Sequence, residues 1–271
     1  MGIPIFNKKV RAFTLAEVLI TLGIIGVVAA LTLPTLMTKI QEQSTVGKLR
    51  KAYNSIENAY QRMISDYGPL DTWDITGYND ADYYEKNEDG TFKLDASGNR
   101  IVGQKGQDSS TLFSKRLTSY LKVIDGCYDY SCAREISEYY MDGVVKNEKF
   151  RDRSTVLSDG IGISSIWIGD SQCKLSYGSS KALQHICGDM YVILKPRTRK
   201  RISGVDFFGF YITKYGIVPF SMPQYSHEQQ RMAGCVSKRG WGACTGWVIY
   251  KGNMDYLRCS DLSWEGKDKC K

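Results

Sequence analysis

An uncharged run of 20 residues near the start of the chain limits what this sequence can fold into more than any other feature. The run covers residues 18–37 and follows Lys8, Lys9 and Arg11. As a helix with a rise of about 1.5 Å per residue it would span about 30 Å, the hydrocarbon thickness of a bilayer. A cleaved secretory signal has a shorter apolar core and ends in a small-residue cleavage site. We therefore expect a transmembrane segment over residues 13–37, with its basic end in the cytoplasm and the rest of the chain exported.

One carboxylate, Glu17, stands at the start of this segment. A carboxylate at the centre of a bilayer costs roughly 2.5–3.5 kcal/mol and usually has a partner. Two interpretations are open: Glu17 lies at the membrane interface, where the cost is small, or it pairs with a cation. If a peptidase cuts between Ala12 and Phe13, the new ammonium group of Phe13 in one copy can pair with Glu17 of a neighbouring copy. Such a pair would set the register between copies, because it is strong in a low dielectric.

These residues resemble the N-terminal methylation motif of type IV pilins and of type II secretion pseudopilins. The matching features are the basic leader, Phe13, Thr14, Leu15, Glu17, the apolar stretch and Pro34. The family normally has Gly before the cut, whereas this chain has Ala12. The resemblance implies that a prepilin peptidase removes residues 1–12 and methylates Phe13. It also implies that an inner-membrane assembly platform then builds the chain into a filament with other pilin subunits.

An amphipathic helix is expected to continue the apolar segment. Pro34 should bend or loosen the helix, because it lacks an N–H donor and its ring clashes with the preceding turn. Beyond it, apolar residues recur at intervals of three and four, apart from one gap: Leu36, Ile40, Val46, Leu49, Tyr53, Ile56, Tyr60 and Met63. Gly68-Pro69 ends the pattern. Residues 38–66 should therefore pack an apolar stripe on a sheet.

Residues 67–271 are expected to form an exported globular head. With 42% hydrophobic and 12% aromatic residues, the chain is not disordered in composition. We expect a loop with a small hairpin at 71–110, a helix at 112–124, a hairpin at 154–169 turning at 159–160, a strand at 189–195, two strands at 205–220 turning near 214–216, and a closing block at 244–259. The predicted fold class is α+β, with a long N-terminal helix packed on an antiparallel sheet.

All eight cysteines lie in the head, at Cys127, Cys132, Cys173, Cys187, Cys235, Cys244, Cys259 and Cys270. An even number behind a membrane segment indicates disulfides formed in an oxidising compartment. No CxxC pair occurs and the chain has two histidines, so a structural zinc site is not expected. Eight cysteines permit 105 connectivities, and short-range pairs such as Cys127 with Cys132 and Cys173 with Cys187 are among them.

The head offers few candidates for chemistry. The sequence contains no HExxH, GxSxG or phosphate-loop motif. His185 lies two residues from Cys187, which could indicate a Cys–His nucleophile, but a cysteine among seven others in an oxidising compartment is expected to form a disulfide. A calcium site is a further hypothesis, because five acids lie close together in the sequence: Asp74, Asp80, Asp82, Asp89 and Asp95. They do not have the regular spacing of a calcium-binding loop, and acids in loops are mostly solvated. Tryptophans at Trp167, Trp241, Trp247 and Trp264 form either a binding surface or, more often, core. We expect no catalytic site, no metal and no cofactor.

The resemblance implies a structural subunit, a pseudopilin or minor pilin of a type II secretion pseudopilus or type IV pilus. The alternative is an adhesin or DNA-binding tip pilin whose head recognises a ligand. For DNA, the candidate contact is the basic run KPRTRKR at residues 195–201. A basic run is more often a solvated loop, and the patterned basic face with interleaved aromatics that nucleic-acid binding requires is not visible. Nucleic acid is therefore not the expected partner.

Overall fold

The computed structural model describes residues 14–96, 98, 100–224 and 232–270. The helices are α1 (Leu15–Tyr67), η1 (Leu70–Thr72), α2 (Gln104–Thr118), α3 (Met232–Val236), α4 (Thr245–Lys251) and η3 (Asp255–Leu257). The strands are β1 (Val123–Asp125), β2 (Arg134–Tyr139), β3 (Val145–Asp152), β4 (Thr155–Leu157), β5 (Gly162–Ile168), β6 (Ile186–Ile193), β7 (Lys200–Ile202), β8 (Phe207–Thr213) and β9 (Gly216–Pro219). The chain divides into two compact units, Met1–Gln43 and Ser44–Lys271, and α1 runs through the boundary. The α+β class is confirmed.

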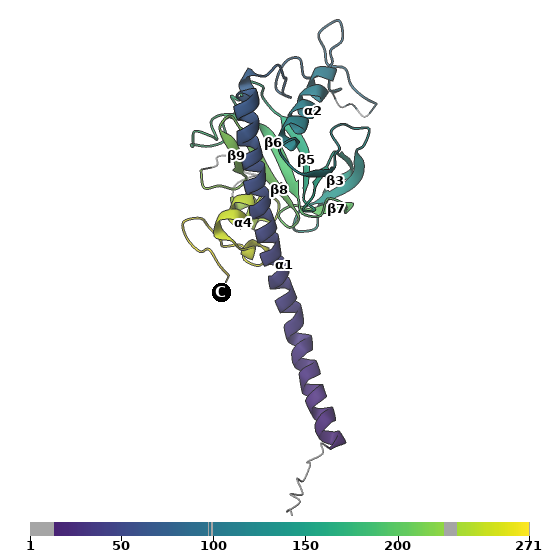
Figure 1. The fold of residues 1–271 in the computed structure, drawn as a ribbon, viewed down its shortest axis with the longest axis vertical. Coiled ribbons are helices and arrows are strands. Elements are labelled where there is room, and N and C mark those ends of the chain that lie inside the picture. Colours follow the sequence, from purple (N-terminus) through teal and green to yellow (C-terminus); the bar gives the residue numbers. More distant parts are fainter. Residues whose placement is uncertain (1–13, 97, 99, 225–231, 271) are drawn as a thin grey trace, which may run out of the picture. The chain divides into compact units, whose positions relative to one another are not determined.

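A six-stranded antiparallel sheet forms the centre of the second unit, in the order β1-β4-β5-β6-β8-β9 (Figure 1). The hairpin expected at residues 154–169 is formed by β4 and β5, with Gly160 at φ +79° in its turn. The two strands expected at 205–220 are β8 and β9, and Thr213 pairs with Gly216 where they turn. Turn residues between apolar runs thus located both hairpins correctly.

Strands β6 and β8 are buried on both faces. In β6, Met190 and Val192 belong to one hydrophobic cluster, whereas Tyr191 and Ile193 belong to another. Side chains alternate along a strand, so these two clusters lie on opposite sides of the sheet. A strand covered on both sides reads as a nearly continuous apolar run, as DMYVIL and FFGFYI do in this sequence.

The second unit's part of α1 covers the first of these faces. Its buried residues recur at helical spacing: Val46, Leu49, Ala52, Ile56, Ala59, Tyr60 and Met63. They share one cluster with apolar residues of β6, β8 and β9 and with Trp247 of α4. Tyr53 stacks on Phe210 of β8 at a centroid distance of 5.8 Å. The predicted stripe is confirmed from Val46 onward.

Polar contacts fix this part of α1 along the sheet edge. The Tyr60 hydroxyl donates to the Thr213 carbonyl at 2.5 Å, and a Glu57 carboxylate oxygen accepts the Ile217 N–H at 2.6 Å. Arg50 Nε donates to the carbonyl of Ile249 in α4 at 2.7 Å. Since hydrogen bonds are directional, they select one rotation and one axial position of the helix over the sheet.

A second sheet, β3-β2-β7, was not predicted. Strands β2 and β3 are antiparallel, and β2 and β7 are parallel. The sequences of β2 and β3, REISEY and VKNEKFRD, carry many charges and lack an apolar alternation. Strand β7 contains Lys200 and Arg201 from the basic run that we expected to be a loop. Charged strands escape recognition from hydrophobic periodicity alone.

Two helices differ from expectation. The helix expected at 112–124 is α2, and it lies eight residues earlier at its start and six earlier at its end. Its buried face includes Gly106, Ser109 and Ser110, small residues that give no apolar signal. The closing block at 244–259 begins with helix α4 rather than extending the sheet. Gly252, in the left-handed conformation at φ +71°, ends α4 as a C-terminal cap.

The polar stretch at 71–110 contains more pairing than one hairpin. Isolated bridges join Lys86 to Phe92 and Leu94 to Arg100, and a third joins Tyr84 to Val102. Arg100 lies over the Phe92 ring with 4.1 Å between its guanidinium carbon and the ring centroid. The expected small hairpin is therefore part of an arrangement of three short segments, each bridged to the other two.

Four disulfides brace the head, and they join Cys127 to Cys132, Cys173 to Cys187, Cys235 to Cys244 and Cys259 to Cys270. The cysteines are thus paired in order along the chain, the first with the second, the third with the fourth, and so on. The first two pairs are those named as short-range possibilities.

A buried ion pair joins two strands of the second sheet, and Ser164 links it to the first sheet. Arg201 of β7 and Asp152 of β3 each have side chains 1% exposed, and Arg201 Nη2 donates to Asp152 at 2.6 Å. Ser164 of β5 and Ser154 also donate to Asp152. Burial opposes ionisation of Asp152, but the hydrogen bonds and charge of Arg201 outweigh burial and hold its pKa below the ordinary value.

Removing one member of this pair should destabilise the head strongly. We expect Arg201→Gln to lower the free energy of unfolding by about 3–5 kcal/mol, because it leaves a buried carboxylate unpaired. Asp152→Asn added to it should restore part of the loss. Because the pKa of Asp152 is lowered, its contribution is present above the unfolded pKa of about 4 and is lost as pH falls through the folded value.

Urea unfolding of the full chain followed by tryptophan fluorescence measures both effects. Arg134→Gln is the matched control, since Arg134 pairs with Asp125 at the surface and exposed pairs contribute about 0–1 kcal/mol. If Arg201→Gln and Arg134→Gln lowered the free energy of unfolding equally, the conclusion that burial makes the Arg201–Asp152 pair structurally important would be wrong.

Candidate functional site

The apolar N-terminal part of α1 has no cover within its own unit. Its large side chains are exposed, including Leu15, Leu19, Ile20, Leu22, Ile24, Ile25, Val27, Val28, Leu31, Leu33, Leu36, Met37 and Ile40. Leu15 is 77% exposed and Leu31 72%. Among the described residues, α1 is the one helix that is long enough and apolar enough to cross a membrane. A run of exposed apolar side chains this long marks a surface made for lipid or for another protein.

Glu17 closes a capping box at the start of α1. Its Oε2 accepts hydrogen bonds from the Thr14 backbone N–H at 2.8 Å and from the Thr14 hydroxyl at 2.9 Å. The Glu17 N–H donates in turn to Thr14 Oγ1 at 3.2 Å. A Thr-x-x-Glu pattern that satisfies free N–H groups of the first turn is a known N-terminal signature. Thr14 belongs to the N-terminal motif, and its spacing of three residues from Glu17 was the signal in the sequence for this capping role.

The hydrogen bonds of Glu17 leave one carboxylate oxygen unused. Among the described residues, every bond to the Glu17 side chain goes to Oε2. A carboxylate offers about four acceptor positions on two oxygens. Capping and an ion pair through Oε1 are therefore compatible. Ala12 and Phe13, between which cleavage is expected, lie outside the described residues.

Helix α1 continues through Pro34 without interruption. Nearby threonines turn their hydroxyls back onto helix carbonyls: Thr38 donates to Pro34 at 2.9 Å and Thr32 to Val28 at 2.9 Å. A hydroxyl bonded to its own helix exposes little polarity to an apolar environment. The threonines thus do not interrupt the apolar surface of the segment.

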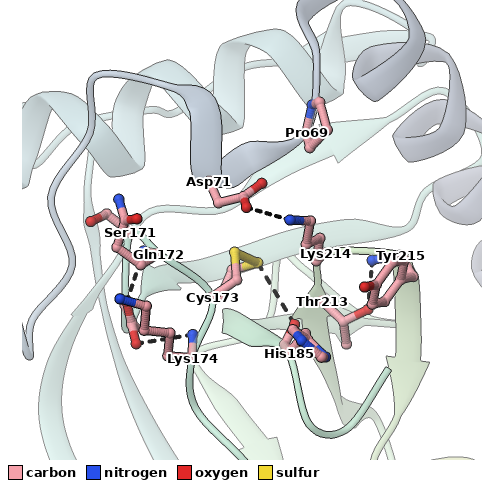
Figure 2. Close-up of a disulfide and its surroundings, with 12 residues drawn as sticks. Pro69, Asp71, Ser171, Gln172, Cys173, Lys174, His185, Thr213, Lys214 and Tyr215 are labelled. Carbon is pink, nitrogen blue, oxygen red and sulfur yellow. Dashed lines mark hydrogen bonds and ion pairs between the residues drawn. A yellow bond between two sulfur atoms is a disulfide. The ribbon is translucent and has the colours of Figure 1, made fainter. Parts of the chain in front are cut away.

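In the described part of the head, no Cys–His nucleophile is formed at His185. Figure 2 shows the disulfide of Cys173 beside His185, and the Cys187 sulfur of this bridge lies 4.0 Å from the His185 carbonyl oxygen. Cys187, bridged to Cys173, is fully buried. His185 Nδ1 lies 3.0 Å from the Lys181 carbonyl, and its ring lies edge-on to Tyr215. The expected bridging of Cys187 is confirmed.

The acids considered for calcium do not gather into one site. Asp80 accepts the backbone N–H groups of Gly77 at 2.7 Å and Ser171 at 3.1 Å. Asp82 accepts from Thr76 and Lys105, and these hydrogen bonds hold its pKa below the ordinary value. Within the described ranges, no cluster of three or more His, Cys, Asp or Glu side chains has metal-binding geometry.

Three of the four tryptophans considered for a binding surface, Trp241, Trp247 and Trp264, lie in packed clusters. Trp247 is fully buried and makes an edge contact with Trp264 at 5.4 Å between ring centroids. Trp241 packs on Phe207 on the other side of the sheet, with Lys146 Nζ 3.3 Å from its ring centroid. Core packing therefore accounts for Trp247, and aromatic and cation contacts for Trp241.

The basic run is divided between the interior and the surface. Arg201 is buried against Asp152, which removes it from the candidate DNA contact. Lys195, Arg197, Arg199 and Lys200 remain exposed. The prediction of a wholly solvated loop was wrong for Arg201, because strand pairing with β2 turns that side chain inward.

Comparison with known proteins identifies the N-terminal segment. The model of the prokaryotic N-terminal methylation motif matches residues 7–33. No curated protein and no solved structure matches the chain, so the head is interpreted from its own residues. The match covers the basic residues before Phe13, the capping-box carboxylate and the exposed apolar helix as far as Leu33. Over these residues the chain is similar to the type IV pilin-like proteins, through the prokaryotic N-terminal methylation motif.

Proposed function

We propose that the chain is a structural subunit, a pseudopilin or minor pilin, of a type II secretion pseudopilus or type IV pilus. The observation that carries the proposal is the methylation motif at the head of an apolar helix that the chain itself leaves uncovered. A helix of this kind is stable in a bilayer before assembly and among like helices afterwards, because both environments cover its side chains. The role is mechanical, so it requires neither an active site nor a cofactor.

The proposed route begins in the inner membrane, with residues 1–12 in the cytoplasm and the head on the far side. A prepilin peptidase cuts between Ala12 and Phe13 and methylates the new amine. The assembly platform then moves the chain into the filament, where Glu17 of one subunit pairs with the Phe13 amine of its neighbour. The capping box engages Oε2, and among the described residues Oε1 of Glu17 accepts no hydrogen bond, which supports this pairing.

The alternative function is ligand recognition by the head, as an adhesin or a DNA-binding tip pilin. Four exposed cations of the basic run support a contact with anions. Burial of Arg201 shortens the basic surface available to a duplex, and phosphate contacts along DNA need an extended positive face. The structural role is therefore the better supported of the two.

Glu17 substitutions separate charge pairing from helix capping. We expect Glu17→Ala to leave membrane insertion intact and to abolish incorporation into filaments. Glu17→Gln keeps an acceptor for the Thr14 N–H, because Gln also serves in a capping box, but it removes the charge. If pairing with the amine is the function of Glu17, both variants fail to assemble.

Immunoblots of sheared filaments and of membranes, from cells with the assembly machinery, measure this. Thr14→Ala is the control that weakens the cap and keeps the charge, and it should still assemble. Normal assembly of Glu17→Gln would show that capping, not charge, is what Glu17 provides.

Processing gives a second test. Mass spectrometry of the membrane-bound chain should find methylated Phe13 as the first residue. Ala12→Gly, which restores the residue usual in the family, should be processed at least as fast, whereas Ala12→Leu should retain the leader because the residue before the cut is small. An intact Met1 in cells that possess the peptidase would indicate a simple signal anchor.

A further inference from the structure

A groove on the head is lined by arginines from separate parts of the chain. Its volume is about 420 Å³, within the range of small-molecule sites. The lining residues are Arg134, Glu135, Ile136, Pro196, Arg197, Thr198, Arg199 and Arg201. They come from β2, from the turn before β7 and from β7 itself. All of its cations are arginines, the residue best suited to hold oxyanions through paired N–H groups.

The turn that carries these arginines is held in place. Pro196 is buried and packs against Gly162 of β5, where an added Cβ would lie 2.7 Å from the Cβ of Pro196. The Ser137 N–H of β2 donates to the Arg199 carbonyl at 2.8 Å. The Thr198 hydroxyl donates to the Lys195 carbonyl at 2.9 Å. A fixed turn loses little conformational freedom when a ligand binds, which favours affinity.

The positive charge in the groove is only partly neutralised. Arg134 pairs with Asp125 at 2.7 Å, and Arg201 pairs with Asp152. Arg197 and Arg199 form no ion pair with any residue in the described ranges. Below them, Nε and Nη1 of the buried Arg201 have no hydrogen-bond partner among the described residues. Buried donors without a partner are rare and call for an explanation such as a bound ion.

We propose that this groove binds a phosphate group, free or carried on a small molecule, with Arg197 and Arg199 as its principal contacts. A carboxylate has two oxygens and is satisfied by one guanidinium fork, whereas a tetrahedral phosphate has enough oxygens for arginines that approach from several directions. Glu135, also in the lining, disfavours a long polyanion such as duplex DNA, because its charge repels further phosphates.

Isothermal titration of the full chain, in a nonionic detergent and at constant ionic strength, tests this. The probes are pyrophosphate and a sugar phosphate, with sodium chloride as the blank. We expect saturable binding of one pyrophosphate per chain, and at least tenfold weaker binding in Arg197→Gln/Arg199→Gln. If the sugar phosphate binds more tightly than pyrophosphate, the natural ligand is a phosphorylated small molecule rather than the free anion.

The control variant is Lys48→Gln/Arg62→Gln, which removes two exposed positive charges outside the groove. It should bind pyrophosphate as the wild type does. Three results would overturn the proposal: heats equal to those of the chloride blank, equal weakening in both double variants, or binding of duplex DNA that pyrophosphate does not displace. Circular dichroism of each variant establishes that it is folded before it is titrated.

Discussion

Burial of one face of α1, from Val46 to Met63, supports the rest of the head. Strands β6 and β8 are apolar on both sides, so the sheet needs cover on the face that α1 occupies. Each fully buried aliphatic or aromatic side chain contributes about 1.5–3 kcal/mol, and this face supplies several. The same helix is uncovered at its other end, from Leu15 to Ile40. One helix is thus buried by its own chain over one part and carries exposed apolar side chains over the other.

The charged side chains also fall into two groups: those whose partners lie within the chain and those without an ion-pair partner among the described residues. Asp152 and Arg201 neutralise each other where two sheets meet, and the serines around Asp152 complete its hydrogen bonding. Glu17 is satisfied on one oxygen by the helix that it caps. Arg197 and Arg199 have no such partner in the described part of the chain. Groups left open in an otherwise satisfied structure are the places where partners bind.

The sequence predicted those elements that hydrophobic pattern and turn chemistry specify. The hairpins β4–β5 and β8–β9, the stripe of α1 and the bridging of Cys187 follow from local rules. The second sheet escaped because its strands are charged, and α2 was misplaced because small residues cover its buried face.

The candidate sites divide in the same way. The apolar surroundings of Glu17 identify it as a candidate in the sequence, and the Thr-x-x-Glu spacing indicates its cap with Thr14. The burial of Arg201 depends on a partner 49 residues away, and such pairing is not encoded locally. For the same reason the groove of Arg134 and Arg197 could not be predicted from the sequence, because it forms only where β2 and β7 run side by side.

The pairing of consecutive cysteines bears on how the head acquires its covalent bonds. The bridges close loops of 5, 14, 9 and 11 residues in sequence, and no bridge encloses or crosses another. When such a chain emerges from its N-terminal end, each thiol meets its native partner before the following cysteine arrives. An oxidant that joins thiols in order of appearance therefore produces the native set, and no shuffling of mismatched bridges is needed. Long-range order in the head then rests on non-covalent contacts: packing, hydrogen bonds and the buried ion pair.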